Sequence, residues 1–473
     1  MTLLGRTYKK VSVASWLLLS GLFLASILIG WFIAFFGEPS YLLVLGVLAT
    51  AFLILLAMQY ERLPFYLFVT ALCLDPIFDV AGIPIIPTIL FGLTILIWLP
   101  QLAMRRTTFI CERRSALFAI PLVIWATIST IYAEDIGAIG YILPYFEAIA
   151  VFFLAQNLLR NKQHLERLGW VLVIACSLFG AFAFFLQVQA FMQAGGTLTA
   201  RQLHVAGRAV GRSADSAPML ITRGVPFALY LFTTSAKRYP IRRYLLVFCL
   251  IFTVLGTLAV VAVGGTIGLI AAFAMVMLLR NKPAQRVRSV VLTTIMILAV
   301  LVSPVAERFE DQWSAIVEGQ PLEWASGRGL VWSAALQVIQ DSPWLGQGPN
   351  PDAVSSAMKD RVPVGSQPDT LERLLPHNIF LRVGTELGLP GLFMYISLIV
   401  ASMLPLWQEI RRRRTRLEDT DLEFLGIGQA IFVASVVFLI QGVAIHLPLQ
   451  PLFWIVLGAG VAFTRMSKHV YEK

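Results

Sequence analysis

Charged residues are scarce in this chain of 473 residues: they make up 14% of it, whereas hydrophobic residues make up 58%. So few charges cannot cover the surface of a soluble domain of this size, and the mean hydropathy of +0.77 excludes that class as well. Most of the chain must therefore lie in a lipid bilayer. Little sequence is left for separate soluble domains, so we expect residues 1–473 to form one membrane domain.

Cysteine is rare, and the common catalytic motifs are missing. Of the four cysteines, Cys73, Cys176 and Cys249 fall in apolar runs and Cys111 falls in a predicted cytoplasmic loop, so no exported disulfide is predicted. The chain has no His-Glu-x-x-His, Cys-x-x-Cys or Gly-x-Ser-x-Gly motif, and no glycine-rich phosphate loop. These absences argue against a nucleotide-driven enzyme, and no cofactor is predicted.

Acidic residues are fewer than basic ones, 27 against 37, which gives a net charge of +10. The basic residues are spread over separate short loops, so the excess fits membrane anchoring, and nucleic acid is not an expected partner. The acidic pairs Glu134–Asp135 and Asp75 with Asp79 could hold a divalent ion, but neither pair has a third ligand in sight. No metal site is predicted.

Long apolar runs are what the sequence has in abundance. Runs of about 20 residues predict transmembrane helices, so the expected fold is an all-α, polytopic helical bundle of about 12 to 14 spans. The runs are Ala14–Phe36, Ser40–Met58, Pro64–Phe78, Ile85–Met104, Ser115–Ala133, Ala138–Leu158, Leu168–Phe191, Ala217–Ser235, Tyr244–Val263, Gly264–Leu279, Val287–Ala306, Arg382–Trp407, Asp421–Val443 and Leu447–Arg465.

The positions of Lys and Arg predict the orientation of these spans. Basic clusters such as Arg105–Arg106 and Arg411–Arg414 fall on one side of the membrane when the spans alternate in direction. Short cytoplasmic loops retain Lys and Arg, so this side is predicted to be cytoplasmic and to hold both termini. Two long loops on the exported, periplasmic side depart from the usual pattern.

The first of these is the basic loop 192–216, which carries Arg201, Arg208 and Arg212 against one acidic residue, Asp215. Cations that are kept on a face that normally excludes them predict an anionic ligand. Contact with the headgroups of membrane lipids is the alternative for any one of these arginines.

The second is the loop 307–376, which is far longer than the usual connection of about 4 to 6 residues and predicts a folded lid with short helices. Residues 328–340 place apolar side chains, among them Leu330, Val331 and Leu336, at helical spacing. This pattern predicts an amphipathic helix that lies at the membrane interface.

A histidine, His377, stands directly before the apolar run that begins at Arg382. Histidine titrates near neutrality and can accept the proton of a sugar hydroxyl, and arginine presents a planar donor fork that suits a pyrophosphate. Asn378 can orient a partner, and Arg382 and Glu386 have the spacing of a mutual i, i+4 pair inside the bundle. The alternative for His377 is a structural residue that binds a lid carbonyl.

These residues belong to a larger block that resembles a motif of the bacterial O-antigen ligases and polymerases, membrane enzymes that transfer glycans from a polyprenyl-pyrophosphate carrier. The motif is His-Asn-x-x-Leu-x-x-x-x-Glu-x-Gly-x-x-Gly, matched here by His377, Asn378, Leu381, Glu386, Gly388 and Gly391.

The resemblance covers roughly residues 201–406 and implies roles for individual residues. It implies that His377 acts on the acceptor hydroxyl and that Arg328, followed by Trp332, binds the pyrophosphate of the donor. Arg208 and Gly211 match an Arg-x-x-Gly element of the family.

One element of the family is missing. Many members carry Ser-Arg-Gly where two spans meet on the exported side, and this chain has Val263-Gly264-Gly265-Thr266 there. We expect Arg212 or Arg201 to replace the missing charge, unless the donor differs.

The function expected is transfer of an undecaprenyl-pyrophosphate-linked oligosaccharide to an acceptor hydroxyl on the periplasmic face of the bacterial inner membrane, without a metal. The acceptor is a lipid A core sugar in a ligase, or another carrier-linked glycan in an O-antigen or exopolysaccharide polymerase. The alternative is a transporter or flippase of lipid-linked glycans, which would use ionisable residues deep in the spans. Glu147 and Arg223 are the main residues of that kind.

Overall fold

The computed structural model describes residues 62–133, 139–196, 199, 202–203, 216–234, 240–279, 283–310, 328–362, 374–415, 422–445 and 447–469. These residues form helices and connecting turns without any strand, which confirms an all-α membrane bundle. Eight of the helices are long and apolar enough to cross a membrane. The first two apolar runs lie outside the described residues, so the count of about 12 to 14 spans stays a prediction.

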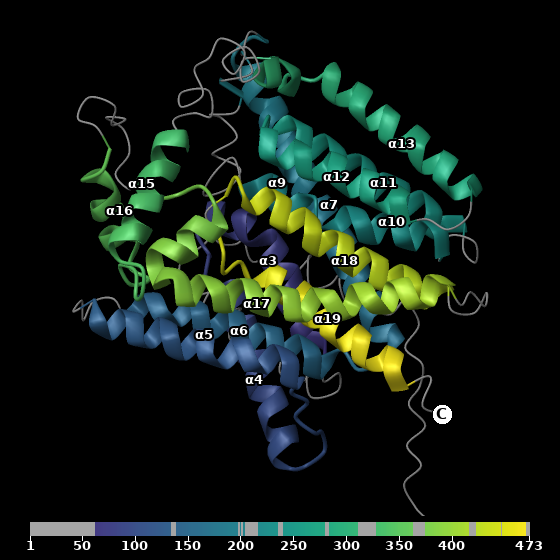
Figure 1. Cartoon of the computed structure of the whole chain (residues 1–473). Helices are drawn as coiled ribbons and strands as arrows, with labels where there is room; N and C mark the ends of the chain where they lie inside the picture. Colours follow the sequence, from purple (N-terminus) through teal and green to yellow (C-terminus); the bar gives the residue numbers. More distant parts are fainter. Residues whose placement is uncertain are drawn as a thin grey trace, which may run out of the picture.

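Every apolar run beyond residue 61 coincides with a helix or a pair of helices (Figure 1). The helices are α3 (Leu63–Val80), α4 (Ile86–Ala103), α5 (Arg113–Tyr132), α6 (Ile139–Leu158), α7 (Lys162–Gln193), α9 (Ser216–Ile221), α10 (Gly224–Thr234), α11 (Pro240–Ala259), α12 (Val263–Leu279), α13 (Pro283–Leu301), α15 (Arg328–Asp341), α16 (Pro351–Lys359), α17 (Ile379–Thr415), α18 (Leu422–Gly442) and α19 (Pro451–His469).

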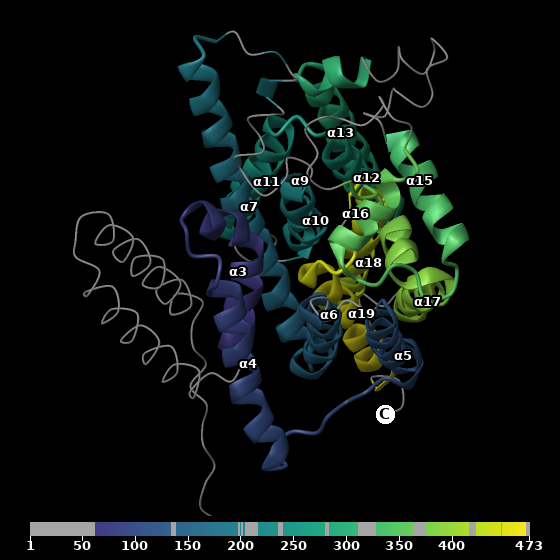
Figure 2. The same ribbon diagram turned by 90° about the vertical axis from the view of Figure 1, so that its left-hand side faces the viewer.

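The helices α17, α18 and α19 pack against one another and form the middle of the bundle (Figure 1). On one side, α5 packs against α17 and α6 against α19; on the other, α10 and α12 pack against α18. The short helices α15 and α16 lie at one end of the bundle, where α15 packs against α17 (Figure 2). This end holds the residues that the sequence motif singled out.

The interior is filled by aromatic side chains and by glycines that let helices approach closely. Trp454 is fully buried and meets the rings of Phe152, Tyr395 and Phe453 edge-on. A Cβ atom added to Gly256 of α11 would lie 2.3 Å from the carbonyl oxygen of Gly180 in α7. Small residues at such crossings allow the van der Waals packing that holds membrane helices together.

The run Ala217–Ser235, which the sequence predicts as one span, is broken into α9 and α10. Thr222 and Arg223 form a turn between them. Pro226 explains the break, because proline donates no backbone hydrogen bond and its ring collides with the carbonyl four residues earlier, here that of Thr222. The break leaves Arg223 inside the bundle, where it is 1% exposed.

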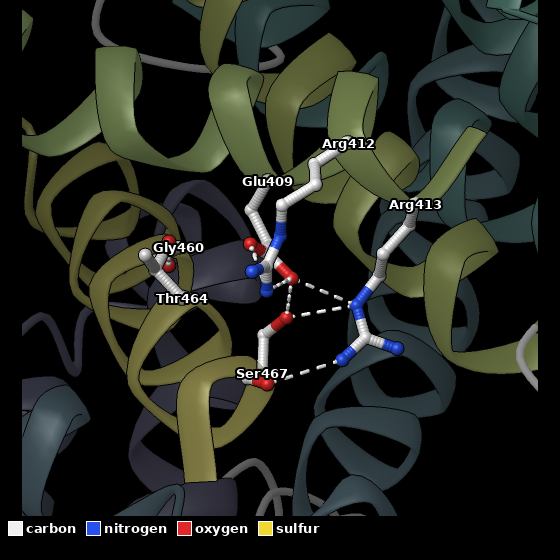
Figure 3. Close-up of polar contacts among 6 residues, drawn as sticks. All are labelled: Glu409, Arg412, Arg413, Gly460, Thr464 and Ser467. Atoms are coloured by element: carbon white, nitrogen blue, oxygen red, sulfur yellow. Dashed lines mark hydrogen bonds and ion pairs between the residues drawn. The ribbon is translucent and has the colours of Figure 1, made fainter. Parts of the chain in front are cut away.

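The C-terminal end of α17 carries a closed cluster of polar side chains (Figure 3). Arg413 Nε donates to Glu409 Oε1 at 2.9 Å and to Ser467 Oγ at 2.8 Å, and Arg412 Nη2 lies 2.9 Å from Glu409 Oε2. Ser467 Oγ also donates to Glu409. Because Ser467 is in α19, the cluster ties the C-terminal ends of α17 and α19 together.

Candidate functional site

The side chain of Asn378 begins helix α17. Its Oδ1 accepts hydrogen bonds from the backbone N–H groups of Phe380 at 2.9 Å and Leu381 at 3.2 Å. This is the geometry of an N-cap, which satisfies donors that the first helical turn leaves unpaired. The sequence suggested that Asn378 orients a partner, whereas the structure shows its oxygen engaged by the helix. His377 directly precedes this cap and is partly exposed.

A buried ion pair lies one helical turn further along. Arg382 Nε binds Glu386 Oε1, and both side chains are buried, which confirms the i, i+4 pair predicted from the spacing. The hydroxyl of Tyr145, in α6, donates to Glu386 Oε2 at 2.6 Å. No hydrogen-bond partner for Arg382 Nη1 occurs in the described part of the chain. The sequence did not indicate Tyr145 as a site residue, because it is one of several aromatic residues in an apolar run.

The glycines of the motif mark a break in α17 at Gly388, whose φ of +66° and ψ of −170° are not helical. Pro390 follows. In a continuous helix its ring would collide with the carbonyl of Glu386, four residues earlier, as the ring of Pro226 would with that of Thr222. A Cβ atom at Gly388 would lie 2.4 Å from the carbonyl oxygen of Trp344. Gly388 therefore allows α17 to pack closely against the loop after α15.

Side chains of α5 satisfy carbonyl groups that the break in α17 leaves open. Trp125 Nε1 donates to the carbonyl of Leu387 at 3.0 Å, and Ser129 Oγ donates to that of Glu386 at 3.1 Å. Because a buried unpaired carbonyl costs free energy, these bonds stabilise the bent form of α17.

The lid loop itself binds the same break through its backbone. Gln347 N donates to Thr385 O at 2.9 Å, and Leu389 N donates to Pro343 O at 2.7 Å. The segment from Ser342 to Gly348 is thus fixed to α17 from both sides of the break. Its attachment holds α15 and α16 at the end of the bundle that carries His377.

The helix predicted at 328–340 is confirmed as α15, Arg328–Asp341. Its buried face consists of Ala334, Ala335 and Val338, which pack with residues of α16. Leu336, one of the apolar residues at helical spacing, is 50% exposed. The position of this helix at the membrane interface stays a prediction.

The lid continues into the segment that carries His377. Leu374 N donates to Ser355 Oγ of α16 at 2.7 Å, and Leu374 is buried in the cluster of α15 and α16 side chains. Arg361 Nη2 and Asp341 Oδ2 form an ion pair at 2.5 Å between the ends of α16 and α15. Only two residues separate this anchored Leu374 from His377, so the lid positions the histidine's backbone.

The arginines predicted to bind the donor are only partly within the described residues. Arg328 is the first residue of α15, and its backbone alone is described, whereas Arg201, Arg208 and Arg212 lie outside the described residues. Trp332 is partly buried, and its Nε1 has no hydrogen-bond partner within the described ranges. The structure thus brings α15 and the start of α17 together, while the grouping of the arginines stays a prediction.

The missing Ser-Arg-Gly element lies at a tight junction. A Cβ atom at Gly265 would lie 2.1 Å from Pro218 Cβ of α9, so no side chain fits there, and one at Gly264 would lie 3.4 Å from Ala444 Cβ. The start of α12 is therefore packed directly against α9. Glu147, the other mid-span ionisable residue besides Arg223, is half-buried in α6 and lies near Asp75 of α3.

Cofactor sites are not evident in the described residues. No three His, Cys, Asp or Glu side chains among them gather closely enough to hold a metal ion. Glu134 and Asp135 lie outside that part of the chain. A mechanism without a metal stays a prediction.

Comparison with known proteins bears on this end of the molecule. Residues 244–396 match the family described as O-Antigen ligase, from α11 to the middle of α17. A search among curated proteins returns no match to the chain. The matched range contains His377, Asn378, Arg382 and Glu386, together with the lid helices that pack on them. This part of the chain is therefore similar to the O-antigen ligases, as the sequence motif indicated.

Proposed function

We propose that this protein transfers an undecaprenyl-pyrophosphate-linked glycan to an acceptor hydroxyl, with His377 as the general base. The observation that carries the proposal is the position of His377: it directly precedes the Asn378 cap of α17, it is partly exposed, and it is anchored through Leu374 to the lid. A base held between a rigid helix and a folded lid suits a reaction that must exclude water.

The reaction joins two sugars and releases the carrier. The acceptor oxygen attacks the anomeric carbon of the donor glycan, and the bond from that carbon to the phosphate oxygen breaks. The imidazole of His377 takes the proton of the attacking hydroxyl. The bonding electrons leave with undecaprenyl pyrophosphate, whose stable anion supplies the driving force.

The negative charge of the leaving group requires cations. Arg328 at the start of α15, with Arg201, Arg208 and Arg212 of the basic loop, is proposed to bind the pyrophosphate through planar guanidinium groups. Arg382 is proposed as a supporting cation, because Glu386 holds its Nε and Tyr145 orients Glu386.

The charge pattern supports a proposal for the cellular setting. The basic ends of α4 and α17 favour a periplasmic position, at the inner membrane, for the opposite end with His377 and the lid. The acceptor is proposed to be a lipid A core sugar or a second carrier-linked glycan, because both present a sugar hydroxyl there.

The test is transfer by the purified full-length protein with a lipid-linked oligosaccharide donor. General-base assistance is typically worth about 10² to 10⁴ in rate, so His377→Ala and His377→Gln should lose that much transfer while they still bind the donor. His469→Ala, at the far end of the chain, is the matched control. The wild-type rate should also fall once the pH is low enough to protonate the imidazole of His377.

Two results would contradict the proposal. Transfer at the wild-type rate by His377→Ala would show that the histidine is structural, and so would loss of the folded protein in both variants. Movement of the donor across a vesicle membrane without formation of a glycosidic bond would instead favour a transporter.

A further inference from the structure

Arg223 is a cation inside the bundle. It lies in the turn between α9 and α10 and is 1% exposed, which makes it one of the largest fully buried side chains of the described residues. Figure 2 shows α9 and α10 near the middle of the view, beside α12. An ionisable residue in such a place is costly to bury and in membrane proteins usually marks a functional site.

One edge of the Arg223 guanidinium group is bound by neighbouring side chains. Nη1 donates to Gln450 Oε1 at 2.6 Å, and the central carbon lies 4.9 Å from the centre of the Phe438 ring. Gln450 Oε1 also accepts from Leu452 N at 2.8 Å, at the start of α19. The amide is thus fixed by the helix and presents a neutral oxygen to the arginine.

The other edge of the guanidinium group is left open to hydrogen bonding. Nε and Nη2 are buried and meet no acceptor among the described residues. These two N–H groups lie on the same side of the planar group and point in parallel, which is the arrangement that binds two oxygens of one phosphate or carboxylate.

No carboxylate of the described residues neutralises Arg223. The thiols of Cys73 and Cys176 are near it, with Sγ atoms 3.9 Å apart, and Cys176 donates to Leu220 O. By contrast, the buried cations Arg382 and Arg413 each bind a glutamate. A buried cation with neutral partners alone is unfavourable unless an anion reaches it.

We propose that the Nε and Nη2 groups of Arg223 form a binding site for a phosphate group of the lipid-linked donor. This inference rests on the proposed function for the identity of the donor. The turn at Thr222–Arg223 separates the six-residue helix α9 from α10.

The test measures binding without turnover. The full-length protein in nanodiscs of phosphatidylcholine is titrated with farnesyl pyrophosphate, a short analogue of the carrier. Loss of two charge-assisted hydrogen bonds should weaken its binding by about 10- to 100-fold in Arg223→Gln. Arg223→Lys keeps the charge but loses the parallel pair of donors, so it should bind with intermediate affinity.

The matched control is Arg465→Gln in α19. Arg465 also has a partner on one side, donating from Nη2 to Gln156 O at 2.9 Å, and an unpaired Nη1 in the described part of the chain, but it lies near the C-terminal end of α19. Its replacement should leave farnesyl pyrophosphate binding unchanged.

Stability provides a second measurement. If Arg223 exists to bind a ligand, Arg223→Gln should raise or preserve the melting temperature of the ligand-free protein, since it removes an uncompensated charge. Unchanged farnesyl pyrophosphate binding in Arg223→Gln would overturn the proposal. So would a variant that loses phosphatidylglycerol from mixed nanodiscs but keeps pyrophosphate affinity, because the anion would then be a membrane lipid.

This outcome is independent of the catalytic proposal. Weak pyrophosphate binding in Arg223→Gln would stand even if His377→Ala proved active. Conversely, an essential His377 with normal pyrophosphate binding by Arg223→Gln would reject the Arg223 site alone.

Discussion

The long helix α17 carries a buried ion pair near each end, and the two pairs are built in opposite order. Near the C-terminus, Glu409 precedes Arg413 by four residues, which is the order that the helix dipole favours. Near the N-terminus, Arg382 precedes Glu386, so a cation occupies the first turn, where the dipole opposes it. One end is arranged for stability, and the other keeps a cation at a cost in free energy.

The side chains around these two ion pairs of α17 also differ. Glu409 binds Arg412, Arg413 and Ser467, and the guanidinium group of Arg413 lies 5.0 Å from the centre of the Phe424 ring. At the other end, Arg382 and Arg223 both retain N–H groups without acceptors in the described part of the chain. The end with His377 is therefore the one at which an anionic ligand is proposed to bind.

The largest effect should come from the closed cluster. Glu409→Gln removes the one carboxylate that two arginines share, so the protein should lose about 3 to 5 kcal/mol of stability. Transfer per folded molecule should stay near the wild-type value. Thermal unfolding in detergent and a transfer assay on the folded fraction check both statements. If Glu409→Gln remained stable but lost transfer, the assignment of this cluster to stability would be wrong.

Variants of the Arg382–Glu386 pair can distinguish an effect on stability from an effect on transfer. Glu386→Met alone leaves Arg382 buried without its carboxylate and should cost about 3 kcal/mol, whereas Arg382→Met/Glu386→Met should recover most of that loss. Transfer should remain impaired in the double variant, because the apolar pair restores packing but not the cation. Recovery of both stability and transfer would show that the pair is only structural.

A smaller effect is expected at the break in α17. Gly388→Ala places a side chain at a φ of +66° and against Trp344 O, which should destabilise the protein by about 1 to 2 kcal/mol. The loop after α15 should detach first, so limited proteolysis between Asp341 and Asn350 should accelerate. Gly140→Ala is the control, since nothing lies within 4 Å of its added Cβ. Equal proteolysis of both variants would exclude this role of Gly388.

Local patterns in the sequence were sufficient for much of this molecule. Hydropathy predicted the membrane class and placed the helices, because each span must bury its own backbone bonds in the bilayer. Spacing alone predicted the Arg382–Glu386 pair, since residues four apart meet on one helix face. The motif around His377 indicated the family to which residues 244–396 are similar.

The tertiary structure decided which groups surround those residues. Tyr145 and Ser129 reach Glu386 from positions 241 and 257 residues away, and no local pattern marks them. The sequence also placed Arg223 in an unbroken span, whereas Pro226 breaks the helix and packing leaves one edge of its guanidinium group unpaired. Periodicity determines which face of a helix is apolar, but only the packing of distant helices determines which buried charge has a partner.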